Sequence, residues 1–101
     1  MQDKFLSAIG LAKRAGGVVF GTEMVRDCAK SGKAKLIIVA SDVSKNTLKE
    51  ITDTAAFYNT ECIISHYTMA EISSAAGLLR NTSSIAMKDE NLTVLVKNSL
   101  N

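Results

Sequence analysis

The sequence has no proline, a single histidine and no long apolar run. It also has no internal repeat and no low-complexity stretch, so nothing marks a linker and the 101 residues predict one domain spanning 1–101. The longest apolar run is Leu36–Ala40, far short of the ~20 residues that cross a bilayer, and no signal-peptide core follows Met1. We therefore expect a cytoplasmic protein with no membrane partner.

Cysteine and histidine are too few, and too scattered, for most metal and catalytic sites. Cys28 and Cys62 lie far apart and form no CxxC pair, which argues against a disulfide framework or a zinc site. We expect two buried thiols. No nucleophile stands at a spacing from His66 that identifies a triad, so we interpret this histidine as a surface or turn residue. No cofactor, metal or small-molecule substrate is expected, and an enzyme is disfavoured.

Charge is distributed unevenly, although the net charge is only +2. Residues 1–49 carry nine basic and four acidic side chains, whereas residues 50–101 carry three basic and six acidic ones. If the basic stretch folds onto one surface, that surface is cationic and an anionic partner is expected. Six basic residues make up this stretch: Lys13, Arg14, Arg26, Lys30, Lys33 and Lys35.

Helical and strand periodicities alternate along the chain, which is typical of an α/β fold. Residues 92–96 fit both a strand and a helix. We favour a helix, because the apolar residues up to Leu100 recur at helical spacing with Leu95 facing inward, and because Asp89 can cap it. The pattern predicts a three-layer α/β/α sandwich on a mixed sheet of about four strands. We expect helices at about 3–14, 22–31, 44–58, 69–76 and 89–100, and strands at 18–20, 36–40, 62–64 and 84–87.

The helix expected at 22–31 separates apolar from charged residues. We expect Thr22 to cap this helix. Separately, we expect the strand at 62–64 to be buried, like the strand at 36–40. The buried stripe of the helix is expected to hold Met24, Val25, Cys28 and Ala29. Its outer face is expected to hold Glu23, Arg26, Asp27 and Lys30.

Gly21, at the junction between a strand and this helix, is the most informative single residue. A glycine there lets another backbone approach closely and leaves the first helical N–H groups pointing outward, as an anion site. A Walker-type phosphate loop is excluded because Thr22 stands where that motif has lysine. Asp42 follows the strand at 36–40, where α/β proteins often bind ligands, but an ordinary turn residue is the simpler interpretation.

The run GTEMVRDCAKSGKAKLIIVASDVSKNTLKEI, from Gly21 to Ile51, resembles the superfamily of small ribosomal proteins that bind kink-turn RNA. Its small bacterial members of the YlxQ type are the most similar. The segments GLAKRAGGVVFG, SKNTLKEITD and the later AAG extend the resemblance over nearly the whole chain. The resemblance implies a non-enzymatic protein that inserts the N-terminus of its second helix into the widened groove of a bent RNA. The implied partner is structured RNA, such as ribosomal RNA or the ribosome.

The resemblance also assigns positions. The corresponding family segment reads glycine, a small residue, Asn, Glu, two variable residues and Lys. Gly21 and Thr22 match its first two positions. At the positions of Asn, Glu and Lys, this sequence instead has Glu23, Met24 and Asp27. Asp27 would repel phosphate, so the alternative is a protein-interaction module of the same fold that has lost kink-turn recognition. Lys33 matches a family position beside the RNA backbone, and Arg80 falls in the loop at 78–83, which in the family packs against an extruded base. The candidate RNA-binding residues are Gly21, Thr22, Glu23, Arg26, Lys30, Lys33 and Arg80.

Overall fold

The computed structural model describes residues 3–100, in which helices and strands alternate. The elements are α1 (Lys4–Ala15), β1 (Val18–Phe20), α2 (Thr22–Lys30), β2 (Leu36–Val39), α3 (Lys45–Phe57), β3 (Cys62–Ile64), α4 (Met69–Ala76), β4 (Ser84–Met87) and α5 (Glu90–Ser99). The strands form one sheet in the order β1-β4-β2-β3, with β2 and β3 parallel and the other two pairs antiparallel. None of the helices within residues 3–100 could span a membrane.

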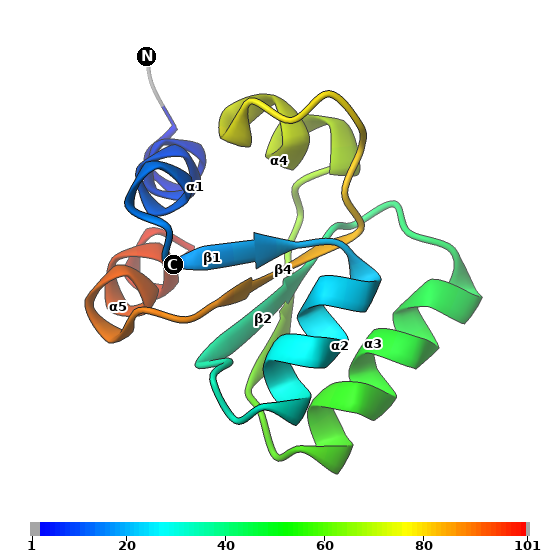
Figure 1. Ribbon diagram of the computed structural model, residues 1–101. Helices are drawn as coiled ribbons and strands as arrows, with labels where there is room; N and C mark the ends of the chain where they lie inside the picture. The colour runs from blue at the N-terminus through cyan, green and yellow to red at the C-terminus, as the bar shows by residue number, and fades with distance from the viewer. Residues whose placement is uncertain (1–2, 101) are drawn as a thin grey trace.

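The sheet is covered on both faces, as the sequence predicts for an α/β sandwich (Figure 1). Helices α1, α4 and α5 pack on one face, and α2 and α3 lie side by side on the other. Successive residues of β2 alternate between the two layers: Leu36 and Ile38 face the first, whereas Ile37 and Val39 face the second. All four side chains are fully buried, which accounts for the continuous apolar run.

The helix ends follow from local capping residues. Asp3 caps α1 by accepting a hydrogen bond from the Leu6 amide at 3.0 Å, and Gly16 ends that helix in the left-handed conformation, at φ 73° and ψ 20°. Ser44 caps α3 and Asp89 caps α5, as predicted. These caps fix the helices at the ends that the sequence predicts.

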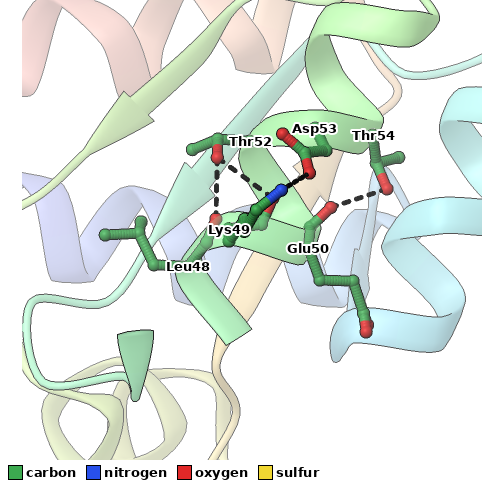
Figure 2. Close-up of polar contacts among 6 residues, drawn as sticks. All are labelled: Leu48, Lys49, Glu50, Thr52, Asp53 and Thr54. Carbon is green, nitrogen blue, oxygen red and sulfur yellow. Dashed lines mark hydrogen bonds and ion pairs between the residues drawn. The ribbon is translucent and has the colours of Figure 1, made fainter. Parts of the chain in front are cut away.

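Several polar side chains of α3 form contacts within the helix itself (Figure 2). The hydroxyls of Thr52 and Thr54 each donate to the carbonyl oxygen four residues earlier, at 2.9 Å. Lys49 forms an exposed ion pair with Asp53 at 2.7 Å, an interaction that contributes little to stability. Glu50 is exposed on the same face and forms no ion pair within residues 3–100.

Three predictions of burial are wrong. Strand β3 lies at the edge of the sheet, so Ile64 is 57% exposed and the Cys62 thiol is only partly buried. Leu95 is 45% exposed because α5 turns its fully buried neighbour Val96 toward the core, and adjacent helical residues point ~100° apart. Met24 is 52% exposed, since the buried side of α2 consists of Val25, Cys28 and Ala29.

Asp3 also joins α1 to the segment that follows β3. The Tyr67 hydroxyl donates a 2.6 Å hydrogen bond to Asp3 Oδ2, and the Tyr67 ring stacks on Phe5 at a centroid distance of 4.4 Å. This hydrogen bond is the main cause that lowers the pKa of Asp3 below its ordinary value of 3.8. The same bond, assisted by burial, raises the pKa of Tyr67 from 10.0 to about 12.

We expect Tyr67→Phe to flatten the pH dependence of stability at both extremes. Asp3 stabilises the fold above pH 3.8 and loses this effect as the pH falls through its lowered pKa. Tyr67 stabilises it below pH 10.0 and loses this effect as the pH rises toward about 12. Melting temperatures of the wild type and the variant, measured from below pH 3.8 to above pH 10.0, test the prediction. Parallel curves with a constant offset would contradict it.

Candidate nucleic-acid interface

The turn from β1 into α2 depends on the backbone of Gly21. Its φ of 93° and ψ of 153° lie in a region that is essentially restricted to glycine. Gly21, and not Thr22 as the sequence predicts, is the N-cap: its carbonyl accepts the first helical hydrogen bond, from Val25 at 2.9 Å. Because glycine has no side chain, no side-chain hydrogen bond caps the first turn of α2. The amides there remain available to an anion.

Thr22 instead connects this turn to the start of β4. Its hydroxyl lies 2.8 Å from the hydroxyl of Ser83, and the Gly21 amide donates to the Ser84 carbonyl at 2.9 Å. In Figure 1 the segment between α4 and β4 passes beside the turn between β1 and α2. Two segments distant in sequence are thus held together at one end of the sheet.

The loop at 78–83 is anchored at its base and exposed at its tip. The Thr82 amide donates to Ser73 Oγ, a buried acceptor on α4, at 2.7 Å, and the Thr82 hydroxyl donates to the Ser84 carbonyl at 3.0 Å. Leu79 is fully exposed, and Arg80 is exposed beside it. The loop therefore presents one apolar and one cationic side chain on a fixed base.

An open groove of about 700 Å³ separates this loop from the β1–α2 turn. Among the described residues that line it, Arg80 is the charged one; the others contribute hydroxyl, amide and apolar groups. The positive end of the α2 dipole adds to the positive potential of Arg80. This arrangement suits a ligand that combines phosphate with an apolar face. The lining residues are Phe20, Gly21, Thr22, Met69, Gly77, Leu78, Leu79, Arg80, Asn81, Thr82 and Ser83.

The structure divides the residues that the sequence grouped together. Gly21, Thr22 and Arg80 line the groove, and Glu23 and Arg26 are exposed on the adjoining turns of α2. Lys30 and Lys33 lie at the other end of α2, which is ~12 Å away at a rise of ~1.5 Å per residue.

The basic stretch therefore does not fold onto one surface. Lys13 and Arg14 belong to the last turn of α1, in the helical layer on the opposite face of the sheet. Arg14 lines a separate groove between α1 and α4. The separation follows from the topology, because β1 lies between α1 and α2 in the chain and the two helices cover opposite faces.

Sequence reasoning missed two contributors to the groove. Leu79 reads only as part of a loop, although an apolar residue next to an arginine at a loop tip is a usable signal for base contact. Ser73 gives no signal at all, because its role depends on the amide of Thr82 across a turn.

Two other polar residues that the sequence singled out lie outside the groove. Asp42 accepts a hydrogen bond from the Met69 amide at 2.8 Å, so it has the turn role that the sequence favoured. His66 is exposed and lies against the Tyr67 ring. Both contacts are structural.

The cysteines and carboxylates are dispersed in the described part of the chain. Within residues 3–100, no group of three or more His, Cys, Asp or Glu side chains could hold a metal ion. Cys28 and Cys62 are both free, and burial raises the pKa of each thiol. At neutral pH the thiols are therefore predominantly protonated, which makes them poor nucleophiles.

Comparisons with known proteins agree on one family. The model of the ribosomal protein L7Ae/L30e/S12e/Gadd45 family matches residues 3–96. The RNA-binding protein YlxQ of Enterococcus faecium is 36% identical over 76 residues, 75% of this chain and 73% of that protein. The RNA-binding protein YlxQ of Bacillus subtilis (strain 168) is 40% identical over 50 residues, half of each chain.

Solved structures show the same fold. A protein of unknown function from Bacillus halodurans C superposes with a TM-score of 0.88 at 25% identity and covers 98% of both chains. A 15.5kD RNA binding protein from Giardia lamblia superposes with a TM-score of 0.74 at 14% identity and covers 96% of this chain and 82% of its own. From the family model and the first of the two YlxQ relatives, this chain belongs to the ribosomal protein L7Ae/L30e/S12e/Gadd45 family.

Proposed function

We propose that the protein binds structured RNA, without catalysis, through the groove between the β1–α2 turn and the loop at 78–83. The observation that carries this proposal is the α2 N-terminus without a side-chain cap, which faces the same groove as Arg80. Both features attract phosphate, and together they are typical of an anion site. The two YlxQ relatives, which are named RNA-binding proteins, support this function.

The two walls of the groove suit different parts of the RNA. The amides of the first α2 turn fit a phosphate or a base edge, whereas Leu79 and Arg80 fit the face of an unstacked base. Unstacked bases beside a sharp backbone bend are features of kinked RNA, so a kink-turn or a similar ribosomal RNA element is the proposed ligand. The proposal includes the cytoplasmic location, the single domain and the absence of catalysis that the sequence predicts.

Arg80→Ala is expected to weaken binding of a kink-turn hairpin about fivefold, ~1 kcal/mol, because one cationic contact is lost. The slope of log affinity against log salt concentration should decrease by roughly one contact. Fluorescence anisotropy titrations at several salt concentrations measure both quantities. Arg14→Ala is the matched control, since Arg14 is exposed on the opposite helical layer and lies outside the groove. Equal affinities for Arg80→Ala and wild type would place the RNA elsewhere.

The exposure of Met24 favours one second candidate, a protein-interaction module. This side chain is 52% exposed at the family position of Glu, beside the acidic Asp27, and an exposed apolar residue suits a protein contact better than phosphate. Gel filtration of cell extract with and without nuclease separates the two functions. A large complex that survives nuclease treatment supports the protein partner, and one that disappears supports RNA.

A further inference from the structure

Four lysines gather at the end of the sheet opposite the groove. The Lys35 amide donates to the Met87 carbonyl at 2.7 Å, which brings the start of β2 beside the end of β4 and Lys88. The Lys33 amide donates to the Cys28 carbonyl at 3.1 Å, just after α2 ends, and Lys30 occupies the last turn of that helix. We call Lys30, Lys33, Lys35 and Lys88 the lysine cluster.

Lys33 and Lys88 come close although they are far apart in sequence. Burial raises the pKa of the Cys28 thiol, and the positive charges of Lys88 and Lys33 act in the opposite direction on the same sulfur. Within residues 3–100, neither lysine forms an ion pair. The acidic neighbour Asp89 is engaged in capping α5. The lysine cluster is thus a local concentration of positive charge with free ammonium groups.

The lysine cluster cannot share one small ligand with the groove. Thr22 lines the groove and Lys30 begins the cluster, and these ends of α2 are ~12 Å apart. The exposed face of α2 between them carries both signs of charge, with Glu23 and Asp27 next to Arg26. Two separate contacts, rather than one continuous cationic strip, follow from this arrangement.

We propose that the lysine cluster binds the phosphate backbone of a helical RNA segment that flanks the element held in the groove. This inference rests on the proposed function, because the same polymer would occupy both sites. The cluster contains only ammonium groups, which act as point charges on phosphate, and it has no arginine fork that reads base edges. The contact would therefore add affinity without sequence specificity.

Two RNAs and two double variants test this inference. The RNAs are a kink-turn hairpin and the same hairpin with one arm lengthened by a helical turn. The test variant is Lys35→Gln with Lys88→Gln, two members of the lysine cluster that are not among the candidate residues of the groove. The control is Lys4→Gln with Lys49→Gln, which removes the same charge from the first turn of α1 and from the face of α3 in Figure 2. Anisotropy titrations over a range of salt concentrations give affinities and salt slopes.

We expect the wild type and the control to bind the long RNA about tenfold tighter than the short one, with a steeper salt slope. The test variant should lose this advantage and bind the short hairpin within about twofold of wild type. Two results would overturn the inference while leaving the proposed groove intact. In the first, the test variant loses the same affinity for both RNAs. In the second, the wild type binds the long RNA no tighter than the short one. Failure of the wild type to bind either RNA would overturn the proposed function, and the inference with it.

Discussion

Gly21→Asn is expected to weaken RNA binding at least tenfold, a loss of ~1.4 kcal/mol in binding free energy. It is also expected to lower the free energy of unfolding by ~1–3 kcal/mol. The stability loss arises from the backbone: at φ 93° and ψ 153° a side chain is strained, although a Cβ would meet no atom within 4 Å. The affinity loss arises because relief of that strain rotates the first turn of α2 and covers the approach to its amides. Thermal unfolding and anisotropy titration measure the two effects.

Gly16→Asn is the matched control for this variant. Gly16 has the left-handed conformation, φ 73° and ψ 20°, which asparagine adopts more readily than most residues. It lies at the end of α1, away from the groove, and a Cβ at this position would likewise meet no atom within 4 Å. We expect a small loss of stability and unchanged RNA affinity. If Gly21→Asn behaved like Gly16→Asn in both assays, the conformation of Gly21 would not position the site.

Restoring the family residues should strengthen kink-turn binding about tenfold, ~1.4 kcal/mol. The triple variant carries Glu23→Asn, Met24→Glu and Asp27→Lys. All three positions are exposed on α2 beside the groove, so the substitutions disturb no core contact. The largest part of the effect comes from Asp27→Lys, which replaces repulsion of phosphate by attraction. Titration of the kink-turn hairpin against wild type measures the gain.

Glu50→Lys is the control for this experiment. It changes the net charge by the same amount as the triple variant, but on the exposed face of α3. A comparable gain from Glu50→Lys would show that total charge, and not the geometry of the site, sets the affinity. No gain from the triple variant would indicate that the groove takes an RNA other than a kink-turn.

The architecture could be predicted because its signals are local. Asp3, Ser44 and Asp89 each accept a hydrogen bond from an amide three residues ahead, so a cap can be recognised within one turn of sequence. Gly77 ends α4 in the left-handed conformation for an equally local reason. The continuous apolar run of β2 identified the centre of the sheet, since only a strand covered on both faces is apolar throughout.

What escaped prediction depends on contacts between distant segments. The position of β3 at an edge, and with it the exposure of Ile64, depends on the strand order, which no residue of β3 specifies. Thr22 is an acceptable cap residue by type, but the hydroxyl of Ser83 engages it instead. The division of the basic residues likewise follows from which face of the sheet each helix covers. Gly21 and Arg80 were found as single residues, but not the groove that they share.

The hydroxyl contact between Thr22 and Ser83 has a thermodynamic consequence. It joins residues 61 positions apart, so the two walls of the groove come from distant segments that folding brings together. A ligand seated between them binds the native state and not the unfolded chain. At a concentration of ~100 times its dissociation constant, such a ligand adds ~2.7 kcal/mol to the free energy of unfolding. The melting temperature of the protein is thereby expected to rise as RNA occupies the proposed groove.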